Sequence, residues 1–273
     1  MSDIFDEFGR LGLRASRSQL EALLTHATKN RLSPVQVVEH LVDIERRERD
    51  ARNLASRAKK ASVGTHKTMD LFDWDHPRKI DRMLCEEQIL NLAFVRTRSN
   101  VLFRGPAGLG KTMLEQNTAT TALAAGMTVC FTNVGAALAD LLRQESLPAV
   151  ERRMKRYTNV DLLAFDELGY VPCDARAADL LFQIISRRHE KASTIIATNL
   201  AFQEWGPMFH GAASLVPLID RFTQHLVTVD IEGESYRQKE KDTPPVSPRS
   251  PSSVRAAPKV GARRRTKARR PTT

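Results

Sequence analysis

Residues 105–112 are GPAGLGKT, and they lie between a short apolar run at 101–103 and a helix predicted over 112–125. The spacing G-x-x-x-x-G-K-[ST], after a strand and before a helix, is the pattern of a phosphate-binding loop. Its glycines let backbone N–H groups turn toward phosphate oxygens, and the start of the helix adds the positive end of its dipole. We therefore predict that this loop binds the phosphates of a nucleotide.

The side chains at the end of the loop have distinct expected roles. Lys111 is expected to place a positive charge on the β- and γ-phosphates, and Thr112 to offer its hydroxyl to Mg²⁺. The predicted nucleotide-binding residues are Gly105, Pro106, Ala107, Gly108, Leu109, Gly110, Lys111, Thr112 and Met113.

A second signal is a pair of carboxylates at the end of an apolar strand, in the sequence DLLAFDE at 161–167. Paired acids often do no more than solvate the end of a strand, but the phosphate-binding loop upstream favours a functional pair. Asp166 is expected to hold Mg²⁺ through its water shell. Glu167 is expected to orient and polarise an attacking water, which predicts hydrolysis rather than nucleotide binding alone.

Two further polar positions follow apolar segments. Asn199 ends the strand-like run STIIATN at 193–199, and its amide would lie near the γ-phosphate if that strand lies beside the phosphate-loop strand. A simple turn cap is the alternative for Asn199. Arg221 precedes the last predicted strand, where it could form a surface ion pair or neutralise the γ-phosphate of a neighbouring subunit.

The order of the predicted elements indicates an α/β fold. Apolar runs predict five strands at 101–103, 128–131, 160–165, 194–197 and 226–231, and helical spacing predicts helices at 112–125, 136–143 and 175–189. Strands that alternate with helices favour a parallel sheet with crossover connections. Residues 80–96 also have helical spacing. The expected divisions are a helical domain at 1–60, a linker at 61–78, an ATPase domain at 79–240 and a basic tail at 241–273.

The N-terminal segment predicts a small all-helical domain. Its apolar residues recur at helical spacing, and Ser33 followed by Pro34 is typical of a helix start. From residue 45 to residue 60 the sequence is ERRERDARNLASRAKK, which is strongly basic. A solvated helix face and a nucleic-acid contact explain this stretch equally well.

Composition limits the classes of protein. The 273 residues carry a net charge of +10, and nine of the 42 Lys and Arg residues lie in 242–273, where only one acidic residue occurs. This tail predicts a disordered basic arm. No apolar run reaches 18 residues and the N-terminus does not resemble a secretory signal, so we expect no membrane span. Cys85, Cys130 and Cys173 are too few and too far apart for a disulfide framework, which fits a reducing cytoplasm.

The ordered series of motifs resembles a known family. The segments GPAGLGKT, LLAFDELGYVP, STIIATNLAFQEW and LIDRFTQHLVTVDIEGESYR are similar to the IstB-type transposition helper ATPases of bacterial insertion sequences. These are relatives of the DnaC-like helicase loaders in the AAA+ class. The resemblance extends from about residue 8 to residue 240, and it implies a five-stranded parallel AAA+ core behind a helical N-terminal domain.

The resemblance implies roles for individual residues. Gly105, Gly110, Lys111 and Thr112 fall on the Walker A positions, and Asp166 and Glu167 fall on Walker B. Asn199 falls on sensor 1 and Arg221 on the arginine finger. The implied catalytic residues are thus Glu167, Lys111, Asn199 and Arg221, and the implied metal ligands are Thr112 and Asp166.

The family also implies cofactors and partners. ATP and Mg²⁺ would drive assembly of a homo-oligomer on double-stranded DNA in the bacterial cytoplasm. The oligomer would present target DNA to a partner transposase, and ATP hydrolysis would regulate that complex. A DnaC-like helicase-loading adaptor is the alternative, and a small-molecule kinase is a more distant one.

The sequence departs from the family pattern at a few positions. Glu115 places an unusual charge in the first turns of the helix after the loop, and Ala164 is smaller than the usual aliphatic residue. No lid domain with a sensor 2 arginine is apparent. Phe72 and Trp74 are expected to pin the linker to the core rather than pack on adenine. Arg187 and Arg188 are predicted to lie at the end of a helix, where positive charges interact favourably with the helix dipole. A second role across a subunit interface is the alternative.

Overall fold

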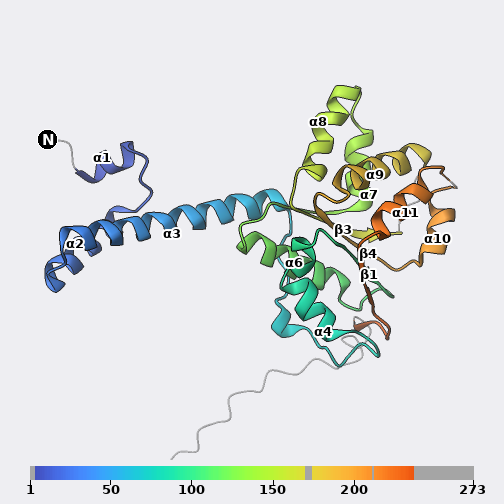
Figure 1. Ribbon diagram of the computed structural model, residues 1–273, viewed down its shortest axis with the longest axis horizontal. Coiled ribbons are helices and arrows are strands. Elements are labelled where there is room, and N and C mark those ends of the chain that lie inside the picture. Colours follow the sequence, from blue (N-terminus) through green and yellow to red (C-terminus); the bar gives the residue numbers. More distant parts are fainter. Residues whose placement is uncertain (1–3, 170–173, 211, 237–273) are drawn as a thin grey trace, which may run out of the picture.

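The computed structural model describes residues 4–169, 174–210 and 212–236. The predicted basic tail at 241–273 and Cys173 lie outside these residues. A helical arm and an α/β core make up the described chain, and one long helix joins them (Figure 1). The described cysteines, Cys85 and Cys130, are both buried and unbridged.

The core is built on a sheet of five parallel strands. They are β1 (Asn100–Arg104), β2 (Val129–Asn133), β3 (Leu162–Leu168), β4 (Ser193–Thr198) and β5 (Leu226–Asp230). The strand order is β2-β3-β4-β1-β5, with every neighbouring pair parallel. All five predicted strands are confirmed. The acidic strand β3 is separated from the phosphate-loop strand β1 by β4, the order that an AAA+ core requires.

Helices cover both faces of this sheet, so alternate strand residues enter two different cores. They are α6 (Lys111–Ala124), α7 (Val134–Leu142), α8 (Leu147–Thr158), α9 (Ala175–Arg188), α10 (Phe202–Met208) and α11 (Leu215–Thr223). On β3, Leu163 and Phe165 join the cluster of α7 to α11, whereas Leu162 and Ala164 join that of α6. Burial on both faces explains why the strands are almost wholly apolar.

Several helices were not predicted, and one predicted helix is interrupted. Helix α8 is strongly charged, and α10 and α11 are short, so their apolar residues show no clear helical spacing in the sequence. Residues 80–96 form α4 (Arg82–Leu84), the π-helix η2 (Cys85–Leu90) and α5 (Ala93–Arg96). The break falls at Leu92, whose left-handed φ of 64° ends one turn and starts the next. Side-chain periodicity does not reveal such a backbone break.

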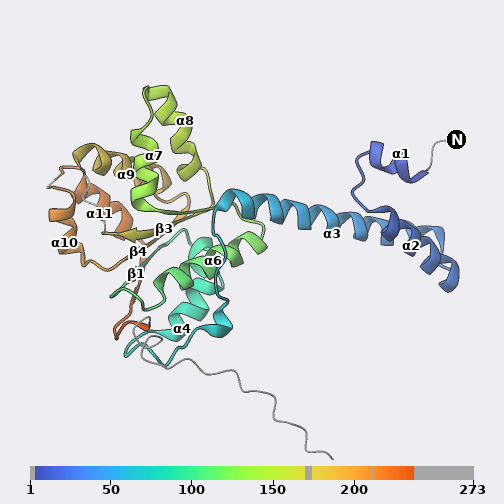
Figure 2. The same ribbon diagram turned by 180° about the vertical axis from the view of Figure 1, so that it is seen from behind.

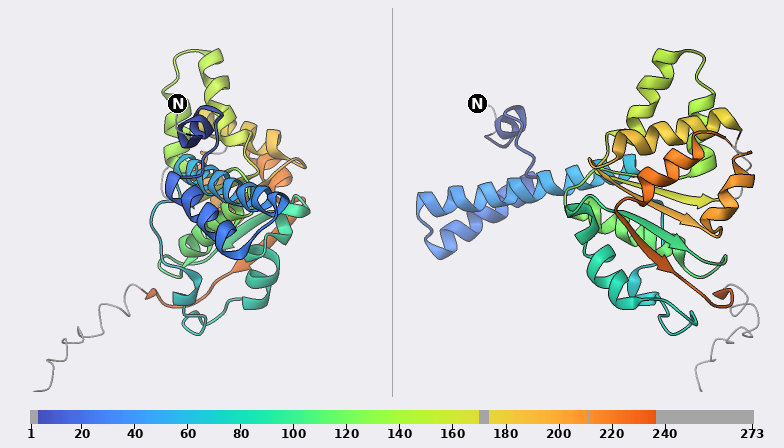
Figure 3. Two further views of the ribbon diagram at one scale, coloured as in Figure 1. Left: turned by 90° about the vertical axis from the view of Figure 1, so that its left-hand side faces the viewer. Right: turned by 45° about the vertical axis from the view of Figure 1, so that its right-hand side comes forward.

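The arm contains α1 (Ile4–Arg10), α2 (Arg17–Asn30) and α3 (Pro34–Ala61). Ser33 accepts a hydrogen bond from the backbone of Gln36, which confirms the predicted start of α3. Helix α2 packs along the outer part of α3, and α3 continues to the core as a single helix (Figures 2 and 3). The basic stretch at 45–60 is the inner half of α3. No described helix is apolar over a length that would cross a bilayer.

Hydrogen bonds join the base of the arm to α6, the helix that begins at the phosphate-binding loop. Arg57 donates to the carbonyl of Leu123 at 3.3 Å, and Gln116 donates to the carbonyl of Val63 at 3.1 Å. Asn117 donates to the carbonyl of Lys67 at 2.9 Å, just before the short helix η1 (Met69–Leu71). The chain between arm and core is therefore fastened along α6 rather than free.

Candidate nucleotide-binding site

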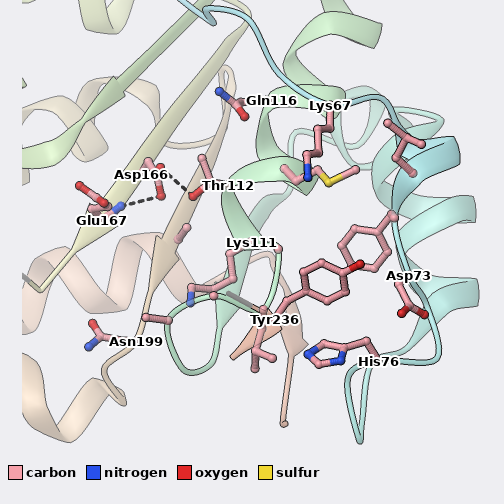
Figure 4. A pocket seen from close by; sticks show the side chains of 18 of the residues that line it. Lys67, Asp73, His76, Lys111, Thr112, Gln116, Asp166, Glu167, Asn199 and Tyr236 are labelled. Carbon is pink, nitrogen blue, oxygen red and sulfur yellow. Dashed lines mark hydrogen bonds between the residues drawn. The ribbon is translucent and has the colours of Figure 1, made fainter. Parts of the chain in front are cut away.

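A cavity of about 410 Å³ opens at the carboxyl ends of β1, β3 and β4 (Figure 4). In parallel α/β sheets, ligands bind at this edge, where the strand order changes direction. Most of the predicted site residues meet here: those lining the cavity are Ala107, Gly108, Leu109, Gly110, Lys111, Thr112, Met113, Asp166, Glu167 and Asn199. A cavity of this size is typical of small-ligand sites.

The loop conformation depends on its glycines. Gly108 and Gly110 have φ values of 81° and 84°, in the left-handed region that favours glycine. A Cβ atom at Gly108 would lie 2.1 Å from Oγ of Ser235, and one at Gly110 would lie 2.5 Å from Cε2 of Phe72. Larger residues at either position would thus clash with segments that close over the loop.

Lys111 lies at the start of α6 and reaches back along the loop. Its Nζ donates to the carbonyl oxygens of Gly105 and Pro106 at 2.6 and 2.7 Å. Gly105 and Pro106, which were predicted to bind nucleotide, therefore contact Lys111, although they do not line the cavity themselves. The loop holds its lysine over the place where phosphates are expected.

Thr112 and Asp166 are brought together from α6 and β3. The Thr112 hydroxyl donates to Oδ2 of Asp166 at 2.9 Å. Burial raises the pKa of Asp166 above its usual value, and the hydrogen bond from Thr112 opposes this shift. A hydroxyl and a carboxylate that meet at a phosphate-binding loop are the oxygen donors that suit Mg²⁺, so these residues fit the expected metal.

An irregularity at the end of β3 sets the direction of the Glu167 side chain. The register shifts between Phe165 and Leu168, and Glu167 has a left-handed φ of 58°. Non-glycine residues in this region are uncommon and concentrate at functional sites. Its carboxylate accepts a hydrogen bond of 2.5 Å from the amide of Asn133, at the end of the neighbouring strand β2. Asn133 was not predicted, although a polar residue after a buried strand next to β3 could have pointed to it.

Asn199 and Arg221 take different places. Asn199 follows β4, which lies beside β1 as expected, and it lines the cavity. Arg221 lies on α11, exposed, with its guanidinium 5.2 Å from the centre of the Phe182 ring. It does not line the cavity of its own chain.

Glu115 is fully buried on α6, one turn after Lys111. Within the described residues, neither of its carboxylate oxygens has a hydrogen-bond partner. Burial, together with the nearby charge of Asp166, raises the pKa of Glu115 well above its usual value of 4.5. The folded protein therefore favours the protonated form of this side chain.

This burial predicts a measurable pH dependence. Because folding raises the pKa of Glu115, the free energy of unfolding should fall as pH rises above about 4.5, by about 1.4 kcal/mol per pH unit until the folded pKa is reached. Glu115→Gln should remove this loss, so its stability advantage should grow from pH 5 to pH 8. Urea unfolding across that range measures the difference, with the exposed Glu87→Gln as control. Parallel profiles for all three proteins would contradict it.

Two segments outside the predicted set also line the cavity. Phe72 comes from the segment before α4, and Tyr236 comes from the segment after β5. Phe72 packs on Trp74 at 4.6 Å between ring centres, as expected for a pinned linker, but it also faces the cavity. The guanidinium of Arg82 lies 5.4 Å from the centre of the Trp74 ring, and Trp74 is outside the cavity lining.

The suggested role of Arg188 across a subunit interface is wrong. Arg188 is 1% exposed, and its guanidinium donates to Oγ1 of Thr194 and to the carbonyls of Tyr157 and Val160, at 3.0, 3.0 and 2.7 Å. It fastens the end of α8 and the start of β4 from inside the core. Arg187 forms a two-point ion pair with Glu151 at 2.7 and 2.6 Å.

Comparisons with known proteins identify the family of this chain. The model of the IstB-like ATP-binding protein family matches residues 6–244. The ATP-binding protein of insertion sequence IS21 from Pseudomonas aeruginosa is 34% identical over 232 residues, which cover 85% of this chain and 87% of that protein. The corresponding protein of IS5376 from Geobacillus stearothermophilus is 30% identical and covers 85% and 92%.

Similarity to crystal structures is more distant. That of DnaI is 15% identical, covers 65% of this chain and 92% of that one, and has a TM-score of 0.49. That of the DnaC helicase loader is 19% identical, covers 59% and 96%, and has a TM-score of 0.45. With its phosphate-binding loop and its pair of carboxylates in one cavity and the family model matched over almost the whole described chain, this protein belongs to the IstB-like ATP-binding proteins of insertion sequences.

Proposed function

We propose that the protein hydrolyses ATP with Mg²⁺ and uses this cycle to regulate its assembly on target DNA for a partner transposase. The observation that carries the proposal is the convergence of Lys111, Thr112, Asp166 and Glu167 in one cavity. Binding alone would need only the first three. A second acidic residue that lines the cavity next to Asp166 favours activation of a water.

The residues divide the work within one chain. Thr112 and Asp166 would hold Mg²⁺, which neutralises phosphate charge when bound. Lys111 would exchange its bonds to the loop carbonyls for bonds to the β- and γ-phosphates. Glu167 would accept a proton from the attacking water, and Asn199 would fix the γ-phosphate from β4. The hydrogen bond from Asn133 would hold Glu167 away from that water until nucleotide binds.

Assembly would complete the site. Arg221 is exposed on α11 and does not line the cavity of its own chain. We infer that it reaches the γ-phosphate of a neighbouring copy, which makes hydrolysis depend on a homo-oligomer. The division into a helical domain at 1–60, a linker at 61–78, an ATPase domain at 79–240 and a basic tail at 241–273 remains part of this proposal.

The arm is the part of the described chain that best suits duplex DNA. On α3, Glu45 accepts a hydrogen bond of 3.1 Å from the backbone N–H of Ala15, and Glu48 accepts one of 2.7 Å from Gln19. Two of the three acids of the basic stretch therefore face the segment around α2, whereas Arg46, Arg47 and Asp50 are exposed. This partial segregation of charge favours phosphate contact over the solvated-face interpretation.

Salt dependence tests this DNA contact. Each phosphate contact contributes about −0.9 to the slope of log K against log salt on duplex DNA. The double variant Arg46→Ala/Arg47→Ala should therefore lower the magnitude of the slope by about 2 and weaken binding across unrelated sequences. Fluorescence anisotropy with a duplex at 50–200 mM salt, with ATP present, measures both quantities.

A matched variant separates local contact from net charge. Arg82→Ala/Arg98→Ala removes the same charge from the core, where Arg82 pairs with Glu86 and Arg98 donates to the carbonyl of Glu190. This control should leave the slope unchanged. If both double variants change it equally, the arm is not the DNA surface. DNA binding that depends neither on the salt concentration nor on the nucleotide would contradict the whole proposal.

The partner follows from the insertion-sequence family. We infer that the protein acts in the bacterial cytoplasm and contacts the transposase of the same insertion sequence. Affinity purification of the full chain in the presence of ATP and DNA should recover that transposase. Recovery of a replicative helicase in its place would favour the helicase-loading alternative.

A further inference from the structure

One end of the cavity is built by two segments that lie about 160 residues apart in sequence. One is the stretch before α4, which contributes Phe72, Asp73 and His76. The other follows β5 and ends at Tyr236. In Figure 4 the Tyr236 side chain lies between those of Lys111 and His76, on the opposite side of Lys111 from Asp166. Neither segment belongs to the phosphate or metal machinery.

Phe72 is held directly against the phosphate-binding loop. Its ring lies so close to Gly110 that a Cβ atom there would approach Cε2 to 2.5 Å. The ring packs on Trp74, and the backbone N–H of Phe72 donates to the carbonyl of Met69 at 3.1 Å. Phe72 is therefore fixed both in position and in orientation where the loop opens into the cavity.

Tyr236 is fixed from the other side. Its backbone N–H donates to the carbonyl of Gly108 at 3.0 Å, which ties the end of this segment to the loop. The ring of His76 meets the Tyr236 ring edge to face, 4.8 Å between centres. Nε2 of His76 also contacts the carbonyl of Glu234 at 2.9 Å. His76 thus orients the Tyr236 ring and the chain that leads to it.

We propose that Phe72 and Tyr236 form the base subsite, holding the nucleotide base by their ring faces and discriminating only weakly between adenine and guanine. This inference rests on the nucleotide binding of the proposed function. A loop that places phosphates at Lys111 and Thr112 leaves the base to extend toward the opposite end of the cavity, where these two rings lie. Aromatic faces stack on any base, because every base has a π-face.

The polar side chains at this end of the cavity already interact with other groups of the protein. His76 is engaged with Glu234 and Tyr236, as described above. Oδ1 of Asp73 accepts a hydrogen bond of 3.2 Å from the backbone N–H of Asp75, and Lys67 is also engaged. Strong discrimination between bases needs side chains that hydrogen-bond to the base edge. Engaged side chains favour recognition through the ring faces instead.

Competition binding with three probes tests the subsite. ATP, GTP and inorganic tripolyphosphate, each with Mg²⁺, compete against a fluorescent ATP analogue. The unaltered protein should bind ATP and GTP within about tenfold of each other. Tyr236→Leu and Phe72→Leu should each weaken both nucleotides by roughly 10- to 100-fold and leave tripolyphosphate unchanged. Phe202→Leu is the matched control, since Phe202 packs on Trp205 and lies outside the cavity lining, and it should change none of the three.

Each other result has a distinct meaning. Equal weakening of all three probes would place the rings at the phosphates and overturn the subsite. Weakening of ATP alone, or of neither nucleotide, would overturn it as well. Thermal unfolding of each variant identifies any loss of fold. Failure of the proposed function looks different: the unaltered protein would bind none of the probes, or Lys111→Ala would bind all three normally.

Discussion

Glu167→Gln should lower the rate of ATP hydrolysis by about 10²- to 10⁴-fold while ATP affinity stays unchanged. The amide keeps the size of the side chain but cannot accept a proton from water. Phosphate binding rests on the loop and on Lys111, which this change does not touch. Steady-state phosphate release gives the rate, and titration with a fluorescent ATP analogue gives the affinity.

The same variant tests the coupling between hydrolysis and DNA. If hydrolysis dissolves the assembly, Glu167→Gln should sediment with duplex DNA as long-lived complexes in ATP but not in ADP. Asp166→Asn is the contrasting variant, since loss of a metal ligand should weaken Mg²⁺-dependent binding and prevent assembly. Undiminished hydrolysis in Glu167→Gln would assign the activation of water to another group. A phosphorylated small molecule as product would indicate a kinase.

Arg188→Met should lower the free energy of unfolding by on the order of 3–5 kcal/mol. The guanidinium donates to the carbonyls of Tyr157 and Val160 inside the core, and methionine fills similar volume without a donor. Carbonyls left buried and unpaired are the main cost. Burial also lowers the pKa of Arg188 to about 10, so its charge persists at neutral pH. Urea unfolding measures the change.

Arg187, the residue before Arg188, supplies the control. Arg187 is half-buried at the surface and paired with the exposed Glu151, and surface ion pairs contribute about 0–1 kcal/mol. Arg187→Met should therefore cost no more than about 1 kcal/mol. An Arg188→Met protein of normal stability whose mixed oligomers lose ATP hydrolysis would restore the role of Arg188 across an interface.

The sequence predicted the sheet and the phosphate end of the site because both depend on local patterns. The five strands are apolar runs of limited length, and GPAGLGKT has the spacing that its own backbone requires. The end of the helix before β4 was also predicted at Arg187 and Arg188. The burial of Arg188 could not be predicted from the sequence, because carbonyls from α8 and β4 surround its guanidinium only after the chain folds.

Residues that depend on long-range contacts were the ones missed. Asn133 is notable only because β2 lies beside β3, where its amide reaches Glu167. Tyr236 joins the cavity because its segment turns back over Gly108. The sequence favours a linker contact for Phe72 over an adenine contact, because nothing in the sequence near Phe72 places it against Gly110. Glu115 stood out only as an unusual charge, and its complete burial required the structure.

The length of helix α3 would enlarge a small rotation at its base into a larger displacement at its far end. Its 28 residues form one helix, and Arg57 near its base is hydrogen-bonded to Leu123 at the end of α6, the helix that begins at the phosphate-binding loop. At about 1.5 Å per residue this rod is about 42 Å long, so a tilt of about 10° at its base carries its far end through about 7 Å. That displacement is about twice the 3.4 Å rise of one base pair along duplex DNA. The length of α3 would thus convert a small rotation beside α6 into a displacement at the far end of the arm larger than the spacing of successive base pairs.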